Sequence, residues 1–473
     1  MDSKVVASTK QAGFKNRFAI RLLSYTACCS LFMRTDKTTL QDLSVFGPEG
    51  GVFYLLDHTL SAVGRATLRR MIEAPPQNFE ALVRVQEVVR WWHANPQFWT
   101  GFISNGTVVM LERFFEAADS VAAPSSGILG YLAPAIQKLF NRNEFTFVKF
   151  SVQQLADFYI GLRELLDKAG GFPEAPARLR EVLNEISGSI DVPLIDRLRA
   201  VTGSTPHNEL AQLAYRARRE LKTITHQLLL HFAQLDAWRS LALATRKQNW
   251  QFPELLPEGN VRFEGEGLYH PLLKRPVPYD LTLTQTEHFL LLTGANMSGK
   301  TTFLRSLGLA ALLAHVGCGV PATRLRISFL QGIVTNMHVE DNLLKGESYF
   351  FAEVQRMKST ALRLQNHEPH LVLMDELFKG TNVHDAYECT KAVVEGLAGR
   401  QNQLMVLSTH LHEIAAHFEG NSALQFGRFV TEQAPDGSFS FPYKLLPGVS
   451  SDRIGYRILQ REGVLELLKG KAN

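Results

Sequence analysis

The sequence predicts an all-α region at residues 36–250 followed by an α/β domain at residues 251–473, with residues 1–35 as a basic lead-in. Between residues 60 and 250, apolar residues recur at steps of three and four, the period of helices that bury one face. After residue 250, the short apolar runs 289–292, 370–374 and 404–407 have the length of buried strands, and residues 302–314 have helical spacing. This mixture of strands and helices is typical of an α/β fold.

The apolar spacing over residues 210–235 predicts one long helix from about Pro206 to Thr245. At 1.5 Å per residue, this helix would be roughly 60 Å long. A helix of that length is suited to act as a lever, and an ordinary bundle helix is the alternative.

The segment Gly294-Ala-Asn-Met-Ser-Gly-Lys-Thr-Thr302 contains the Gly-x-x-x-x-Gly-Lys-Thr pattern of a phosphate-binding P-loop. It lies between a predicted strand and a predicted helix, where backbone N–H groups and the helix N-terminus hold phosphate. We expect Lys300 to reach the β- and γ-phosphates and Thr301 to ligate Mg²⁺. The predicted nucleotide-binding residues of the loop are Gly294, Ala295, Asn296, Met297, Ser298, Gly299, Lys300, Thr301 and Thr302.

Two further strands end in polar residues that suit nucleotide hydrolysis. The run 370–374 leads into Asp375 and Glu376, as in a Walker B segment. Asp375 is predicted to hold Mg²⁺ and Glu376 to act as the general base for the attacking water. The run 404–407 leads to His410, a predicted γ-phosphate sensor, for which a structural histidine is the alternative.

The residues of these motifs resemble those of the MutS family of DNA mismatch repair ATPases. The Asn296-Met297 pair, the stretch from Asp375 to Asp385 and the Thr409-His410 pair are similar to family motifs, and Gly346-Glu-Ser-Tyr-Phe-Phe-Ala-Glu353 is similar to its signature loop. The resemblance implies a P-loop ATPase domain of the MutS/ABC-like type, with ATP and Mg²⁺ as cofactors. It also implies that Ser348 completes the nucleotide site of a partner chain in a homodimer. Capping of a helix that begins near Tyr349 is the alternative role for Ser348.

Upstream, residues 36–43, 55–59 and 64–70 resemble the entry to the family's core domain, and residues 235–236 and 253–254 resemble the return from its lever. The resemblance therefore covers about residues 36–465 and implies a helical core and lever domain at 36–250. We expect no mismatch-reading or connector domain before Asp36, and no full DNA clamp within residues 170–206. True mismatch reading is accordingly not expected.

The resemblance also implies contacts to adenine, although Pro276 stands where the family has an aromatic residue. We expect Val277 to cover one face of the base and Tyr443 to lie on the other. After Gly463 the sequence lacks the helix-turn-helix tail of many family dimers, so we expect a dimer that is weak or forms with ATP.

Composition sets limits on partners and compartment. The net charge of +4 over 473 residues gives no global basic field for nucleic acid. A local basic cluster is the candidate DNA contact, and a solvated helix face balanced by Glu209 and Glu220 is the favoured alternative. The cluster comprises Arg216, Arg218, Arg219 and Lys222.

The cysteines and the N-terminal segment bear on the compartment. Cys28, Cys29, Cys318 and Cys389 have neither metal-site spacing nor a disulfide pattern, which suits a reducing cytoplasm. Basic residues precede the apolar stretch 22–33, which is shorter than the ~20 residues that span a bilayer. An amphipathic lead-in helix is favoured, with a signal peptide or membrane-surface association as alternatives. We expect no membrane partner.

These features predict an ATPase that couples ATP binding and hydrolysis to the binding of DNA structures in repair or recombination. The alternative is a nucleotide-switched scaffold that binds a protein and no DNA. An ATPase of the SMC or transporter type is disfavoured, because the helical region lacks sustained heptads and no membrane-coupling segment is visible.

Overall fold

The structure is a computed structural model that describes residues 35–47, 50–116, 142–169, 174–202, 205–337, 349–433, 439–450 and 455–468. Most of the basic lead-in, Cys28, Cys29 and Ser348 lie outside the described residues. The chain forms two compact units. Within the described residues, one unit holds 57–71 and 84–244, and the other holds 35–56, 72–83 and 245–468. The domain boundaries at 36–250 and 251–473 stay a prediction.

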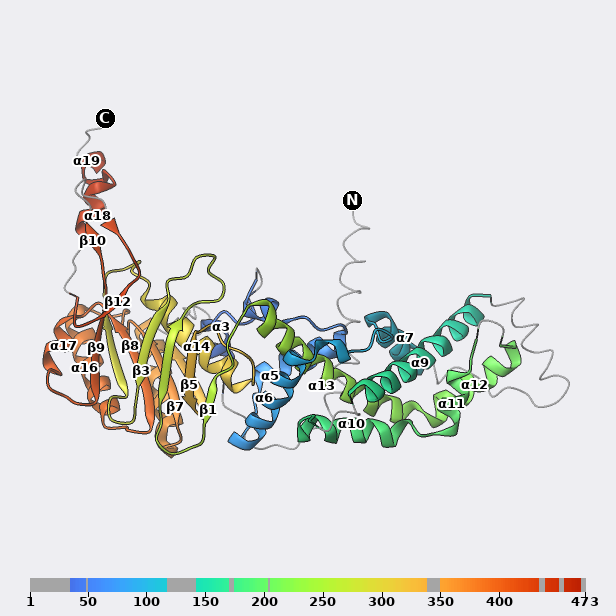
Figure 1. Ribbon diagram of the computed structural model, residues 1–473. Helices are drawn as coiled ribbons and strands as arrows, with labels where there is room; N and C mark the ends of the chain where they lie inside the picture. Colours follow the sequence, from blue (N-terminus) through green and yellow to red (C-terminus); the bar gives the residue numbers. More distant parts are fainter. Residues whose placement is uncertain are drawn as a thin grey trace. The chain divides into compact units, whose positions relative to one another are not determined.

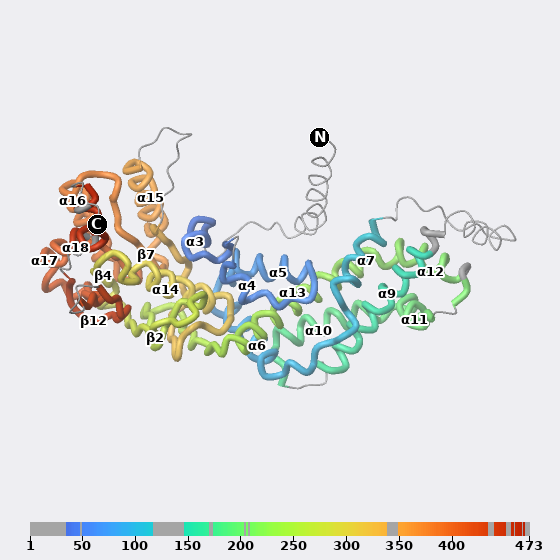
Figure 2. Tube along the Cα trace, turned by 90° about the horizontal axis from the view of Figure 1, so that it is seen from above, coloured from blue at the N-terminus to red at the C-terminus, as the bar shows by residue number. Residues whose placement is uncertain are grey.

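The first unit is built around the 28-residue helix α9 (Arg142–Ala169). Helices α7 (Asn105–Glu116), α10 (Ala177–Ile190), α11 (Pro193–Arg199) and α12 (His207–Glu220) contact α9 (Figures 1 and 2). The remaining elements of this part of the sequence are α5 (Ala62–Glu73), α6 (Phe79–Ala94), a 3₁₀ turn (Pro96–Phe98) and α13 (Lys222–Lys247). Between residues 57 and 247, the described residues form helices and turns and no strand.

The prediction of one uninterrupted helix from Pro206 to Thr245 is wrong, because α12 ends at Glu220 and α13 begins at Lys222. Leu221, between them, has φ −104° and ψ −7°, although its N–H still donates to the Ala217 carbonyl at 2.9 Å. Leu221 is fully buried, and the neighbouring Arg218 side chain is also buried. The backbone geometry of Leu221 thus separates the two helices, although Leu221 itself keeps the apolar period of the segment.

The basic cluster of α12 is engaged within its own unit. Arg216 Nε donates to Glu220 Oε1 at 2.8 Å, and Arg219 Nη1 donates to the Tyr215 hydroxyl at 2.8 Å. Arg218 is buried over the Phe114 ring and donates to the Phe114 carbonyl at 3.2 Å. These contacts favour the helix-face interpretation over a basic patch for DNA.

The second unit contains a six-stranded sheet in the order β12-β9-β4-β8-β7-β6, parallel except for β12 (Figure 1). Its strands are β4 (Phe289–Thr293), β6 (Gly332–Asn336), β7 (His370–Asp375), β8 (Gln403–Thr409), β9 (Leu424–Phe429) and β12 (Leu445–Pro447). Every residue of β4, β6, β7 and β8 is buried, as expected for parallel strands covered on both faces.

Helices cover the two faces of this sheet. Gly308 of α14 (Lys300–His315) packs against Leu373 of β7, while Met374 of the same strand packs in a cluster with α16 (Val383–Ala398) and α17 (Glu413–His417). Because neighbouring residues of a strand face opposite sides, α14 lies on one face and α16 and α17 on the other. Because β4, β7 and β8 run parallel, their carboxyl ends meet at one edge of the sheet.

The other elements of this unit flank the main sheet. A second sheet has the order β1-β5-β2-β3 and comprises β1 (Glu254–Leu256), β5 (Arg324–Ser328), β2 (Phe263–Leu268) and β3 (Tyr279–Leu283). The rest are α3 (Lys37–Asp42), α4 (Val52–Leu56), α15 (Tyr349–Arg363), a 3₁₀ turn (Leu364–Asn366), the hairpin β10 (Glu432–Gln433) and β11 (Phe439–Ser440), α18 (Gly455–Arg461) and α19 (Val464–Leu468). Among the described helices, none has the length and apolar character needed to cross a membrane.

Candidate nucleotide site

A glycine-rich loop joins the end of β4 to the start of α14. Gly294 has φ +152° and Gly299 has φ +104°, conformations that L side chains rarely adopt. A Cβ atom on Gly299 would lie 3.1 Å from Cδ1 of Tyr443, so the space is restricted as well. The two glycines let the loop turn sharply into α14, whose N-terminus carries the positive end of the helix dipole.

Lys300 places its ammonium group within this loop. Its Nζ donates to the carbonyls of Gly294 at 2.9 Å and Ala295 at 3.1 Å, and it lies 3.5 Å from Glu376 Oε1. Burial lowers the pKa of Lys300, whereas the charges of Glu376 and Asp375 act to raise it. A buried cation at the N-terminus of a helix is a favourable setting for a phosphate anion.

The loop also contains a polar atom that lacks a partner. Ser298 is fully buried, and its Oγ has no hydrogen-bond partner among the described residues. A buried hydroxyl without a partner costs free energy, so a polar ligand in the loop would relieve this cost. The loop therefore has the features expected of a cradle for phosphate.

Asp375 lies at the carboxyl end of β7 and binds two hydroxyl groups. Thr301 Oγ1 donates to its Oδ2 at 2.6 Å, and Ser408 Oγ donates to its Oδ1. Asp375 and Ser408 are paired in the register of β7 and β8, which places the Ser408 hydroxyl beside the Asp375 carboxylate. The Thr301 and Asp375 oxygens are hard ligands close enough to share one Mg²⁺.

No group of three or more His, Cys, Asp or Glu side chains suited to a metal ion occurs among the described residues.

Glu376 follows Asp375 in a left-handed backbone conformation with φ +50°, and its N–H donates to the Ser408 carbonyl at 2.9 Å. Its Oε2 lies 2.8 Å from Lys379 Nζ. Burial acts to raise the pKa of Glu376, but Lys379, Lys300 and His410 together hold it below its ordinary value. The group is thus ionised at neutral pH, which is the state that a general base requires.

The remaining predicted site residues have different positions. His410 is exposed just after β8 and near enough for its charge to lower the Glu376 pKa. Tyr443 has φ +55° and lies against Gly299, while Val277 is half-buried between β2 and β3. Tyr279 also reaches the loop, since its hydroxyl is 3.8 Å from the Cβ position of Gly299.

Sequence reasoning assigned no role to Ser408, Lys379 or Glu353. The strand register identifies Ser408, and the three-residue spacing from Glu376 to Lys379 was the available signal for that ion pair. Glu353 accepts hydrogen bonds from the N–H groups of Lys379 at 3.2 Å and Gly380 at 3.1 Å. Glu353 therefore holds the turn that carries Glu376 through hydrogen bonds to its backbone.

Lys379→Met should raise the pKa of Glu376, because it removes the strongest influence that lowers this pKa. If Glu376 is the base, the acid limb of the ATP hydrolysis profile should then lie at higher pH than in the unchanged protein. The measurement is kcat against pH, with the exposed Lys358→Met as the matched control. Identical acid limbs in all three proteins would contradict the ionic role of Lys379.

Comparisons with known proteins agree with this geometry. Residues 290–468 match the family model of MutS domain V. The chain is 31% identical over 312 residues to the DNA mismatch repair protein MutS of Lawsonia intracellularis, covering 63% of this chain and 34% of that protein. It is 34% identical over 249 residues to the protein of the same name from Desulfovibrio desulfuricans, covering 51% and 26%. The chain thus spans about a third or less of the length of these relatives.

The parallel strands, with the glycine-rich loop, Lys300 and two adjacent carboxylates at one edge of the sheet, form the arrangement expected of an α/β ATPase domain. The match to domain V and to these relatives is more specific. Residues 290–468 belong to the MutS domain V family, and the chain is similar to MutS proteins over as many as 312 residues.

Proposed function

We propose that the chain is a Mg²⁺-dependent P-loop ATPase that couples ATP binding and hydrolysis to the binding of DNA structures in repair or recombination. One observation carries this proposal: Lys300, Thr301, Asp375 and Glu376 converge at one edge of the sheet. Thr301 lies 2.6 Å from Asp375, and Lys300 lies 3.5 Å from Glu376. This is the set of groups that phosphoryl transfer to water requires.

Each group has a separate role in the proposed reaction. The loop amides and Lys300 hold the phosphates, and Thr301 with Asp375 holds Mg²⁺, which neutralises charge on the phosphate oxygens. Glu376 accepts a proton from the attacking water, and His410 monitors the γ-phosphate. Tyr443 is proposed to contact the nucleotide, which its position against Gly299 supports, whereas the proposed contact of Val277 rests on the family resemblance alone.

We also propose that the active form is a homodimer with composite sites, in which Ser348 of one chain completes the site of the other. The support for this is the family resemblance of the signature loop. A cytoplasmic location is proposed from the requirement for ATP, and the free thiols of Cys318 and Cys389 suit a reducing compartment.

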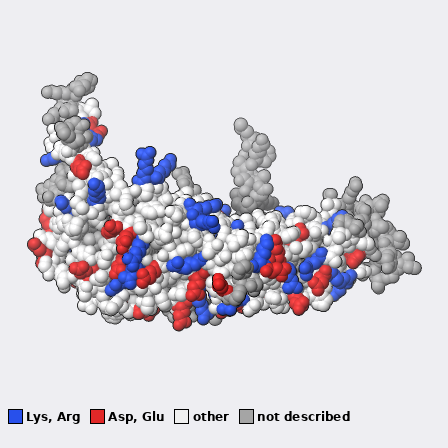
Figure 3. All heavy atoms as spheres, in the orientation of Figure 1, with Lys and Arg blue, Asp and Glu red and all other residues white. Residues whose placement is uncertain are grey.

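DNA binding should be weak, sensitive to salt and changed by ATP. Basic and acidic side chains are mixed over the lower part of the face shown in Figure 3, only small basic groups lie along its upper edge, and the net charge is +4, so few phosphate contacts are expected. Fluorescence anisotropy with duplex, mismatched and branched DNA, at low and physiological salt and with and without ATP, measures this. A large preference for mismatched over matched duplex at physiological salt would contradict the expectation.

A nucleotide-switched scaffold that binds a protein partner is the second candidate. The observation in its favour is that Arg216, Arg218 and Arg219 are engaged within their own unit. Failure to bind any of the three DNAs at low salt, together with intact ATP hydrolysis, would favour this candidate.

A further inference from the structure

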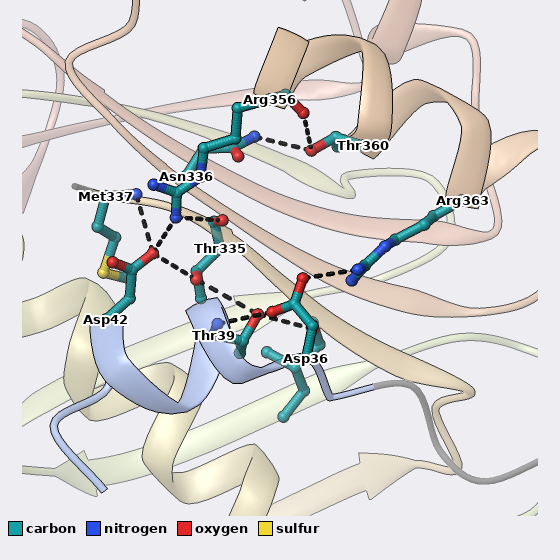
Figure 4. Close-up of polar contacts among 10 residues, drawn as sticks. Asp36, Thr39, Asp42, Thr335, Asn336, Met337, Arg356, Thr360 and Arg363 are labelled. Atoms are coloured by element: carbon teal, nitrogen blue, oxygen red, sulfur yellow. Dashed lines mark hydrogen bonds and ion pairs between the residues drawn. The ribbon is translucent and has the colours of Figure 1, made fainter. Parts of the chain in front are cut away.

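Helix α3 binds helix α15 through an acidic residue at each of its ends, as Figure 4 shows. Asp42, the last residue of α3, pairs with Arg356, and Asp36, its N-cap, pairs with Arg363 at 2.6 Å. Arg356 and Arg363 are seven residues apart on α15, so they lie on one face two turns apart. We call this pair of contacts the α3 clasp.

The two contacts of the α3 clasp differ in depth. The Asp42 side chain is 4% exposed and also accepts hydrogen bonds from Thr335 Oγ1 at 2.6 Å and the Met337 N–H at 3.3 Å. The Asp36 side chain is 35% exposed. A buried carboxylate with several donors fixes its partners more firmly than an exposed ion pair does. Asp42 is therefore the inner contact, and Asp36 is a natural control for it.

Arg356 shares a surface of α15 with Glu353, three residues earlier. Glu353 is buried and accepts hydrogen bonds from the N–H groups of Lys379 and Gly380. Gly380 packs so closely on α15 that a Cβ atom there would lie 2.6 Å from Tyr349 Cδ1 and 2.7 Å from the Phe350 nitrogen. A displacement of α15 must therefore move the backbone of residues 379–380.

The turn held by Glu353 is strained. Glu376 and Phe378 have φ +50° and +60°, values that cost free energy unless the surroundings fix them. Glu376, Lys379, Glu353 and Arg356 line one hollow, so Arg356 is the residue of the α3 clasp that reaches the cavity beside the turn. Glu376, the proposed general base, thus lies on a turn that α15 holds through Glu353. Asp42 in turn holds α15 through Arg356.

We propose that Asp42 is a positioning residue for ATP hydrolysis: through Arg356 it fixes α15, and through Glu353 α15 fixes the turn that carries Glu376. This inference rests on the proposed ATPase function. It assigns to α3 control of the hydrolysis rate rather than of nucleotide affinity, because among the described residues the polar contacts of Lys300 are with the glycine-rich loop and Glu376, not with the clasp. Since α3 precedes the helical unit in sequence, movement of this segment is a route by which the rate can be changed.

The test uses Asp42→Asn, which keeps the shape of the side chain and removes its charge, with Asp36→Asn as the control. Asp42→Asn should leave the Kd for ATP within about twofold and lower kcat by about tenfold or more, because small misplacement of a catalytic group is costly. Asp36→Asn should change both by less than about twofold. Hydrogen exchange should become faster in a peptide covering residues 376–382 of Asp42→Asn and stay unchanged in one covering β4.

A double variant tests whether Asp42 and Glu353 act along one path. Adding Asp42→Asn to Glu353→Gln should cause little further loss of kcat, because the first change has already released the turn. Multiplicative losses, a Kd that rises in step with the loss of kcat, or unchanged exchange at 376–382 would each overturn the proposal. If the unchanged protein does not hydrolyse ATP, the proposed function fails, and hydrogen exchange alone decides whether Asp42 holds the turn.

Discussion

Lys300→Ala should weaken ATP binding by about 10- to 100-fold and abolish turnover, because Lys300 is buried and its proposed charge-assisted contact to phosphate would be lost. Glu376→Ala should leave the Kd for ATP within about threefold and lower kcat by about 10²- to 10⁴-fold, since it removes the proposed base and leaves Lys300 and the loop in place. Calorimetric titration with ATP and a phosphate-release assay measure the two quantities separately. The exposed Lys358→Ala on α15 is the matched control and should change neither.

Equal losses of ATP affinity in Lys300→Ala and Glu376→Ala would contradict this division of roles. Asp375→Asn adds a further check, because weakening one Mg²⁺ ligand should raise the Mg²⁺ concentration needed for half-maximal rate. A rate with the same Mg²⁺ dependence as the unchanged protein would remove Asp375 from the metal site.

Mixing a Lys300→Ala chain with a Ser348→Arg chain should restore ATP hydrolysis that neither chain has alone. In a two-fold dimer with composite sites, the mixed dimer joins both damaged elements in one site and leaves the other intact. Random exchange of subunits should then give about a quarter of the activity of the unchanged protein, since half the dimers are mixed and each has one working site. The measurement is phosphate release after the two chains are incubated together.

Exchange of subunits must be shown independently, by energy transfer between labelled chains. If the chains exchange and no activity returns, the composite site is wrong and Ser348 has another role. Activity of the Ser348→Arg chain by itself would exclude the composite site equally.

The parts of the site that depend on local sequence were predictable. A strand, a glycine-rich turn and a helix are specified by neighbouring residues, and the structure places Gly294, Gly299 and Lys300 in such a loop. The convergence of Thr301 with Asp375 follows from parallel strands that end at one edge, although the residues are 74 positions apart. Periodicity and strand length were sufficient for these features.

The parts that depend on tertiary contact were not predictable. Asp42 and Arg356 are 314 positions apart, and nothing in the spacing of either residue indicates the other. Likewise, the contact of Tyr279 with the glycine-rich loop depends on how the second sheet packs beside the first. Each feature is set by packing between distant segments, which a single sequence does not reveal.

Release of phosphate from ATP by the unchanged protein, measured with Mg²⁺ and again after EDTA, tests most directly whether these residues form an ATPase site. The geometry of Lys300, Thr301, Asp375 and Glu376 predicts turnover that saturates with ATP and is lost with EDTA. No turnover with Mg²⁺ at millimolar ATP, in protein that is folded and exchanges its subunits, would contradict it.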